Sequence, residues 1–149
     1  MRVDKMQPEL TFHVQVEWDG STGGEAKLSV QPPLRFDTPR DFGGSEAGYC
    51  PEELFLASLA ACLTTTFAYL RPKLGLEASS LRINANDRVE FRDGGYMVTE
   101  AWMKVKLEVK KGQAELARQC VELAAEYCHV TRSIRRCIPV HLEVEVVEV

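Results

Sequence analysis

Residues 51–70 read PEELFLASLAACLTTTFAYL, and this stretch decides the fold. Pro51 suits the first position of a helix, and Glu52 and Glu53 suit the positive end of the helix dipole. The segment predicts a helix that ends before Pro72, with apolar side chains around almost its whole circumference. Because a helix that is apolar all round is typical of a buried position, we expect a central helix with the rest of the chain packed around it.

Three short strands are expected before this helix. Residues 11–18 alternate apolar and polar side chains, which is the period of a strand with one buried face. A glycine-rich turn follows at residues 19–24, and residues 25–31 supply a return strand before two prolines break it. Residues 34–36 form a short third strand, and a loop over residues 37–50 leads to the helix.

The segments after the helix predict a hairpin, two helical segments and a last strand. The hairpin joins residues 81–92 to residues 96–109, because the tight-turn sequence DGG separates two alternating runs. Residues 113–127 are amphipathic and predict a helix, followed by a helical turn at residues 131–136 and a strand at residues 140–147. The order β-β-β-α-β-β-α-α-β, with strands gathered in antiparallel hairpins, indicates the α+β class.

The composition is typical of one globular domain. The chain has 149 residues, 45% of them hydrophobic and 27% charged, which predicts a single domain over residues 1–149 with one core. Scattered basic residues and a net charge of −4 argue against a nucleic-acid partner. Residues 1–10 lack the apolar segment of a secretory signal, which predicts a cytoplasmic protein. The uncharged run of residues 54–70 is shorter than the roughly 20 residues that span a bilayer, so no membrane partner is expected.

Five cysteines are the chemically distinctive residues of the chain. Without a secretory signal, a structural disulfide framework is not expected. The cysteines form no CxxC pair and the three histidines add no regular ligand spacing, which argues against a metal site. The five cysteines are Cys50, Cys62, Cys120, Cys128 and Cys137. Two interpretations of their thiols remain: they are buried and inert, or they carry out redox chemistry.

The residues alone leave the role of Cys62 open. A thiol becomes a good nucleophile only as a thiolate, which needs a nearby positive charge or a helix N-terminus. Cys62 lies ten residues after Glu52, so its position in the expected helix supplies neither. On this basis alone, a small hydrophobic side chain inside a buried helix is the plainer interpretation.

The chain resembles the OsmC/Ohr family in two cysteine motifs. RFDTPRDFGG at residues 35–44, PEEL at residues 51–54 and ASLAAC at residues 57–62 are similar to the family's loop and its PEEL…A-x-x-A-x-C helix. AAEYCHV at residues 124–130, followed by an apolar final strand, is similar to the segment that holds the family's second cysteine. The separation of the two motif cysteines also fits the family, and the resemblance covers nearly the whole chain.

This resemblance implies the OsmC/Ohr-like α+β fold, with antiparallel sheets wrapped around a buried central helix. It also implies an intertwined homodimer whose two active sites lie at the subunit interface. The implied activity is that of a thiol-dependent peroxidase acting on organic hydroperoxides or hydrogen peroxide. Cys62 attacks the peroxide, becomes a sulfenic acid and condenses with Cys128, and a thiol or dithiol reductant then reduces the disulfide. No cofactor and no metal are implied.

The resemblance further implies groups that activate Cys62. Glu52 matches the family's glutamate ten positions before the attacking cysteine, where it orients an arginine that stabilises the thiolate; a carboxylate that merely offsets the helix dipole is the alternative. The family draws this arginine from the N-terminal hairpin, where this chain has no basic residue, or from the loop before the helix. In that loop Arg40 fits best and Arg35 second, with a solvated loop arginine as the alternative.

The roles of the other three cysteines and of His129 are expected from their positions in the sequence. Cys50 precedes the helix at the expected N-cap, where the dipole would lower its pKa, or it is an incidental loop residue. Cys120 and Cys137 are expected to be structural, and no proton-transfer role is expected for His129.

Two alternatives to a peroxidase stay open. One is a protein of this fold that binds a small apolar ligand at the dimer interface without turnover, and the other is a thiol redox sensor.

Overall fold

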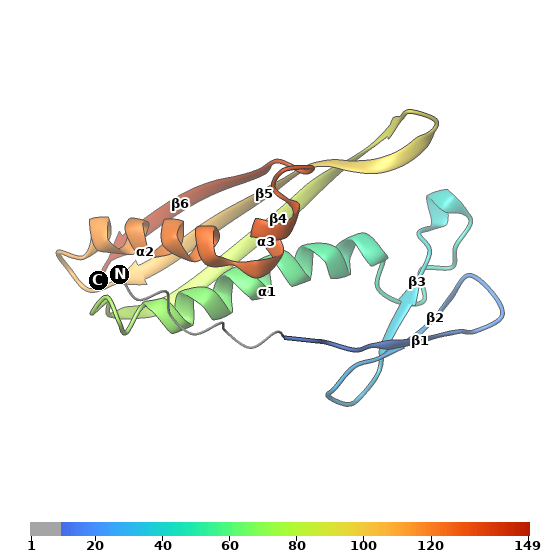
Figure 1. Ribbon diagram of the computed structural model, residues 1–149, viewed down its shortest axis with the longest axis horizontal. Helices are drawn as coiled ribbons and strands as arrows, with labels where there is room; N and C mark the ends of the chain where they lie inside the picture. The colour runs from blue at the N-terminus through green and yellow to red at the C-terminus, as the bar shows by residue number, and fades with distance from the viewer. Residues whose placement is uncertain (1–9) are drawn as a thin grey trace, which may run out of the picture. The chain divides into compact units, whose positions relative to one another are not determined.

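The computed structural model describes residues 10–149, and the expected order of strands and helices is confirmed (Figure 1). The chain forms two compact units that divide between Glu53 and Leu54. The expectation that no secretory signal is present concerns residues 1–10, of which residues 1–9 lie outside the described part. The prediction of a single domain stays a prediction, and the two units are described separately.

The first unit contains a three-stranded antiparallel sheet in the order β1-β2-β3. β1 spans Gln15–Trp18, β2 spans Gly23–Lys27 and β3 spans Leu34–Asp37. A short 3-10 helix, η1, occupies Arg40–Phe42 in the loop that follows. β2 therefore begins two residues before the predicted return strand of residues 25–31 and ends earlier.

Two glycines expected in the turn begin β2 instead. A Cβ atom on Gly23 would lie 2.3 Å from the carbonyl oxygen of Phe36, and one on Gly24 would lie 2.2 Å from the carbonyl oxygen of Glu17. Both distances are far inside van der Waals contact, so only glycine allows the neighbouring strands to approach this closely.

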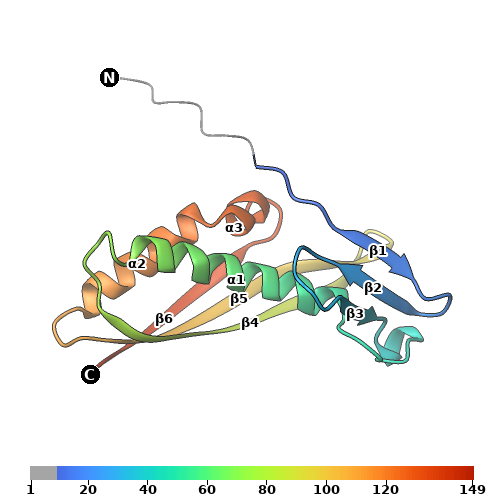
Figure 2. The same ribbon diagram turned by 90° about the horizontal axis from the view of Figure 1, so that it is seen from below.

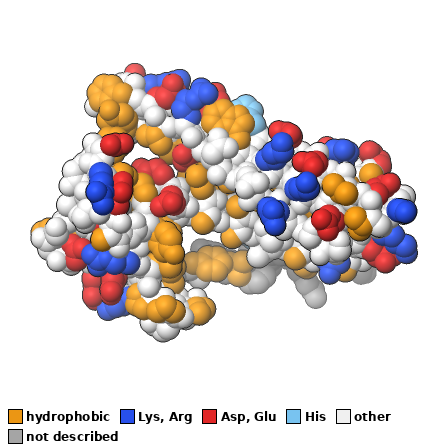
Figure 3. All heavy atoms as spheres, turned by 180° about the vertical axis from the view of Figure 1, so that it is seen from behind, with side chains coloured by type: hydrophobic (Ala, Val, Ile, Leu, Met, Phe, Trp, Pro, Cys, Tyr) orange, Lys and Arg blue, Asp and Glu red, His pale blue; other side chains and the backbone are white. Residues whose placement is uncertain are grey.

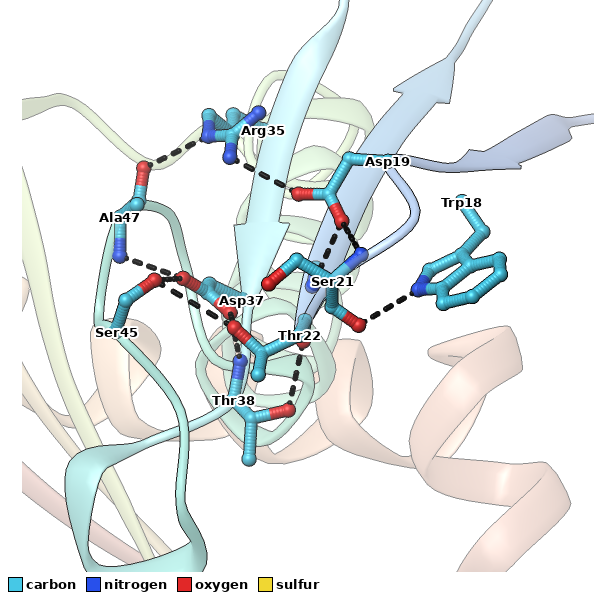
Figure 4. Close-up of polar contacts among 10 residues, drawn as sticks. Trp18, Asp19, Ser21, Thr22, Arg35, Asp37, Thr38, Ser45 and Ala47 are labelled. Atoms are coloured by element: carbon cyan, nitrogen blue, oxygen red, sulfur yellow. Dashed lines mark hydrogen bonds and ion pairs between the residues drawn. The ribbon is translucent and has the colours of Figure 1, made fainter.

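A buried carboxylate, Asp37, organises the loop after β3 (Figure 4). Its Oδ1 accepts hydrogen bonds from the Thr22 hydroxyl at 2.6 Å and the Thr38 amide at 2.8 Å. Its Oδ2 accepts from the Ser45 hydroxyl at 2.5 Å and the Ala47 amide at 2.8 Å. These hydrogen bonds, from Ser45 most strongly, hold the pKa of Asp37 well below its usual range. One side chain therefore ties the loop to the sheet.

The second unit places helices on a three-stranded sheet in the order β4-β5-β6. Figures 1 and 2 show α1 and α2 side by side over one face of this sheet, while the tip of the β4–β5 hairpin projects beyond them. The helices are α1 at Pro51–Leu70, α2 at Ala114–Tyr127 and α3 at His129–Ile134. The strands are β4 at Ala78–Arg92, β5 at Gly95–Val109 and β6 at Val140–Glu148.

β6 departs from the expectation of antiparallel sheets. It pairs in parallel with β5, from Ala101 opposite Val140 to Val109 opposite Glu148. A parallel pair needs a long crossover connection, and α2 and α3 provide one. The sheet of the second unit is therefore mixed, with an antiparallel β4–β5 hairpin and a parallel edge strand.

The core of the second unit lies between the sheet and the helices. Alternate residues of β5 from Ala101 to Val109 are buried, and they pack with buried residues of α1 and α2. The buried residues of α1 recur every four positions and form one stripe: Leu59, Leu63 and Phe67. Other faces of α1 are exposed, at Ala61 and Tyr69 for example. The expectation of a central helix buried on all sides is therefore not met within one chain.

The length of α1 also bears on the membrane expectation. The whole helix, rather than its uncharged part alone, is long and apolar enough to cross a bilayer by length and composition. This is weak evidence for a membrane span, because the core helix of a soluble protein passes the same test. In this protein the stripe of α1 packs into the core of the second unit.

Candidate thiol site

The two motif cysteines meet in the second unit. Cys62 lies on α1 and is half-buried, whereas Cys128 follows α2 at the start of α3 and is fully buried. Both are free thiols, and Cys62 lies near enough to Cys128 to raise the pKa of that thiol. The structure therefore brings together the pair that the resemblance implies.

This meeting follows from how the two helices pack. Cys128 continues the buried stripe of α2, four residues beyond Ala124 and eight beyond Cys120, both of which are fully buried. Cys62 lies between Leu59 and Leu63, the residues that seat α1 in the same core. Both helices cover one face of the sheet (Figure 2). Cys62 lies near enough to Cys128 to raise the pKa of that thiol.

The surroundings of Cys128 determine the protonation state of its thiol. Burial raises its pKa, and the neighbouring Cys62 raises that pKa further. The hydroxyl and backbone amide of Thr131 act in the opposite direction and lower the pKa of Cys128, because they favour the thiolate. Since the net pKa is raised, Cys128 is a protonated thiol at neutral pH.

The three threonines that follow Cys62 are turned toward the helix backbone. The hydroxyls of Thr65 and Thr66 donate to the Cys62 carbonyl at 3.0 and 2.8 Å, and the hydroxyl of Thr64 donates to the Ala60 carbonyl at 2.8 Å. Such bonds to the preceding turn satisfy hydroxyl groups within a helix. They explain how a largely apolar helix accommodates three polar side chains in a row.

Glu52 and Cys50 form a pair at the start of α1, in the first unit. The Cys50 thiol donates a hydrogen bond to the Glu52 carboxylate, and the Cys50 amide donates to Glu53 Oε2 at 2.9 Å, which is one half of a capping box. Burial raises the pKa of Cys50, and the hydrogen bond to Glu52 raises it further. The expectation that the helix dipole lowers this pKa is wrong, because burial and an adjacent carboxylate both oppose ionisation.

Both candidate arginines pair with carboxylates of the first unit. Arg40 Nε lies 3.1 Å from Glu46 Oε2, and the Arg40 side chain is 74% exposed. Arg35 lies 3.1 Å from Asp19 Oδ2, so it is tied to the β1–β2 turn (Figure 4). The sequence showed no basic residue in that turn, but the fold brings one there from β3. A contact between Arg40 and the attacking thiol stays a prediction.

Sequence reasoning missed two neighbours of the thiols. Thr131 lies beside Cys128, and its signal was a hydroxyl residue three positions after a cysteine at a helix start. Arg71 lies close enough to Cys120 to lower the pKa of that thiol, although burial raises it more strongly. Cys137 is exposed, in contrast to the buried Cys120. Among residues 10–149, no group of three or more His, Cys, Asp or Glu side chains could hold a metal ion.

These observations define an α+β protein with two three-stranded sheets and a facing pair of free thiols on packed helices. The family described as OsmC-like protein matches residues 43–143, a span that includes both thiols of the pair. The chain therefore belongs to the OsmC-like protein family.

Known proteins with similar sequences and structures agree with this assignment. Peroxiredoxin OsmC of Escherichia coli is 25% identical over 135 residues, covering 85% of this chain and 92% of that protein. The uncharacterised protein YmaD of Bacillus subtilis is 21% identical over 140 residues, covering 91% and 93%. The crystal structure of an OsmC-like protein from Mycoplasma pneumoniae has a TM-score of 0.81 at 15% identity, covering 95% of this chain and 100% of that one. An organic hydroperoxide resistance protein from Vibrio cholerae, with captopril in one active site, has a TM-score of 0.75 at 20% identity, covering 96% of both chains. The α+β, OsmC-like fold is confirmed.

Proposed function

We propose that this protein is a thiol-dependent peroxidase in which Cys62 attacks a hydroperoxide and Cys128 resolves the product. The observation that carries this proposal is that the half-buried Cys62 thiol lies next to the fully buried Cys128 thiol. The name of the E. coli relative, a peroxiredoxin, agrees with this chemistry. Neither a metal nor an organic cofactor takes part.

The reaction divides into three balanced steps. The Cys62 thiolate attacks one oxygen of the hydroperoxide, the O–O bond breaks, and the released alkoxide takes a proton to leave as an alcohol. Cys62 is thereby oxidised to a sulfenic acid. The Cys128 sulfur then attacks the Cys62 sulfur, a disulfide forms, and the departing hydroxide takes a proton to become water. A dithiol reductant restores both thiols by two exchange steps and is itself oxidised to a disulfide.

The different burial of the two thiols supports this division of roles. A peroxide from solution reaches the half-buried Cys62, whereas the fully buried Cys128 is shielded from it. Since Cys128 already lies beside Cys62, condensation needs no large movement of either helix. A resolving thiol in place before the attack shortens the life of the sulfenic acid and limits its further oxidation.

The proposal includes a homodimer with Glu52 and an arginine completing each site. Glu52 and Cys62 lie ten residues apart in α1, and ten residues of α-helix correspond to a rise of about 15 Å. A carboxylate at that distance along its own helix does not orient a group that touches Cys62. A second copy, with its helix running in the opposite direction, would bring its own Glu52 toward Cys62.

Exposed apolar side chains in each unit also support association with a second copy. Orange hydrophobic side chains lie at the surface among charged ones in Figure 3. At the tip of the β4–β5 hairpin, Phe91 and Tyr96 are exposed and pack edge to face with each other. Large uncovered apolar patches are uncommon on monomers. In the first unit, four alternate apolar residues are 54–86% exposed: Phe12, Val14, Val16 and Trp18.

The alternative function is that of an apolar-ligand binder that keeps the fold without turnover. The pairing of Arg40 with Glu46 favours this alternative, because Glu46 competes with a thiolate for the guanidinium. Peroxide consumption separates the two functions. Purified protein with dithiothreitol is expected to consume tert-butyl hydroperoxide catalytically, at many turnovers per thiol pair. Consumption at the rate of dithiothreitol alone would contradict the peroxidase proposal and favour the binder.

A further inference from the structure

Thr131 presents a buried hydroxyl that has no structural partner. The residue is 6% exposed, and its Oγ1 has no hydrogen-bond partner in the part of the chain that the structure describes. Buried polar groups in folded proteins are nearly always paired, and each exception calls for a reason. A catalytic role is one such reason, because a donor that is unused in the resting protein is available during the reaction.

The position of this hydroxyl points to a sulfur. Cys128 is the N-cap of α3 and Thr131 is its third residue, the spacing at which an N-cap side chain reaches the third residue of a helix. The hydroxyl and backbone amide of Thr131 both favour the charged form of Cys128, which is otherwise opposed by burial. Cys62, across the helix contact, is the titratable group that faces Cys128 here.

We infer that the Thr131 hydroxyl is the donor that stabilises Cys128 as a thiolate during the redox cycle. This inference rests on the proposed peroxidase function and adds a residue to it. In the resting protein the Cys128 thiol is protonated, and the Thr131 hydroxyl has no hydrogen-bond partner. When Cys128 ionises, the hydroxyl donates to the sulfur, and a hydrogen bond to a charged acceptor is stronger than one to a neutral thiol.

The same donor acts in both directions of the cycle. In condensation, Cys128 loses its proton and its thiolate attacks the sulfenic sulfur of Cys62. The S–S bond forms, the S–O bond breaks, and hydroxide leaves as water after taking a proton. In reduction, a reductant thiolate attacks the Cys62 sulfur, and Cys128 departs as a thiolate that is protonated afterwards. Thr131 donates to the Cys128 sulfur at each of these points.

Two substitutions separate the hydroxyl from the shape of the side chain. Thr131→Val keeps the volume and branching and removes the donor, whereas Thr131→Ser keeps the donor and removes a methyl group. Because the hydroxyl has no partner in the resting protein, Thr131→Val is expected to leave the thermal unfolding midpoint unchanged or raise it. A residue with a merely structural role would not combine unchanged stability with slower chemistry. Thr131→Ala serves as a second donor-free variant should the valine be poorly accommodated.

The main experiment follows one turnover of the full-length protein. Each reduced variant is mixed with one equivalent of tert-butyl hydroperoxide between about pH 6 and pH 9. The Cys62 sulfenic acid, trapped with dimedone, and the Cys62–Cys128 disulfide are then quantified by mass spectrometry. Sulfenic acid is expected to form at the same rate in all variants. Disulfide formation in Thr131→Val is expected to be about tenfold slower, the effect of raising the Cys128 pKa by about one unit, and to stay slower across this pH range, because the already raised pKa keeps Cys128 mostly protonated in both proteins.

A failure of this inference can be distinguished from a failure of the proposed peroxidase function. Thr131→Ser is expected within about twofold of the wild-type rate. A donor-free variant that forms the disulfide as fast as wild type over the whole pH range, or a serine variant as slow as the valine variant, would overturn the inference. If wild type forms no sulfenic acid, the peroxidase proposal fails. The inference is then decided by titrating the Cys128 thiolate absorbance with the four other cysteines replaced. An increase of about one unit in the Cys128 pKa of Thr131→Val supports the inference, and an unchanged Cys128 pKa overturns it.

Discussion

The thiols of Cys62 and Cys128 come from distant parts of the sequence and lie side by side between α1 and the α2–α3 junction. One is half-buried and the other is shut off from solvent. This arrangement gives each thiol a separate expected behaviour toward peroxide, and substitution of each by serine distinguishes them.

Cys62→Ser is expected to lower peroxide consumption to the background given by dithiothreitol alone. Serine is nearly isosteric with cysteine but is a poor nucleophile at neutral pH. Circular dichroism and the sedimentation coefficient should remain those of wild type, since the substitution removes no packing volume. Normal turnover in a coupled assay of this variant would rule out Cys62 as the attacking thiol. Cys137→Ser, at an exposed position, serves as the matched control and should retain full activity.

Cys128→Ser is expected to react once with peroxide and then to overoxidise. Without a resolving thiol the Cys62 sulfenic acid persists, and further peroxide converts it to sulfinic and sulfonic acids. Intact mass should show the addition of about two or three oxygen atoms, localised to Cys62 by peptide mapping. An intramolecular disulfide in this variant would instead move the resolving role to Cys50 or Cys120.

Arg40→Met is expected to raise the pKa of Cys62 and to slow its alkylation at neutral pH, because a positive charge beside a thiol favours the thiolate. Arg35→Met, which breaks the ion pair with Asp19, is the comparison and should leave that pKa unchanged. Thiolate absorbance is titrated in a background with the other cysteines replaced. A shift in Arg35→Met alone would transfer the role to Arg35, and no shift in either would favour the ligand-binding alternative.

Asp37→Asn is expected to lower the thermal unfolding midpoint by about 5 °C or more at neutral pH. An amide cannot accept from all of the donors that now surround the carboxylate. Because the folded-state pKa is lowered, the carboxylate stabilises the fold above its unfolded pKa. That contribution disappears as the pH falls toward the folded-state pKa, so wild type and variant should converge in acid. Asp41→Asn, at an exposed position, is the control. An equal midpoint for Asp37→Asn and wild type at neutral pH would show that the network does not stabilise the loop.

The protein is expected to sediment as a dimer at micromolar concentration, and Val16→Glu is expected to weaken the dimer by at least tenfold in dissociation constant. This substitution puts a charge into the exposed apolar row of the first unit, and burying an unpaired charge is strongly unfavourable. Gln15→Glu adds the same charge on the other face of β1 and should leave the dimer intact. A wild-type protein that sediments as a monomer would remove the proposed interface.

Local sequence patterns determined the elements and their order. Alternation of apolar residues indicated the strands, and the proline and acidic residues at positions 51–53 indicated the start of α1, because these signals depend on near neighbours alone. The α+β class followed from that order. The motifs around Cys62 and Cys128 identified the family for the same reason, since each motif is contiguous in the sequence.

The tertiary structure decided everything that depends on which segments become neighbours. The parallel direction of β6 and the place of Gly23 inside β2 depend on pairing partners that a local pattern does not encode. The sequence could not show that Arg35 reaches Asp19 or that Thr131 lies unpaired beside a buried thiol. The burial of a side chain, and with it the pKa of a thiol, is set by the whole fold around it. The sequence therefore indicated which two cysteines matter. Only the packing of α1 against α2 decided that Cys128 is buried and Cys62 is half-exposed.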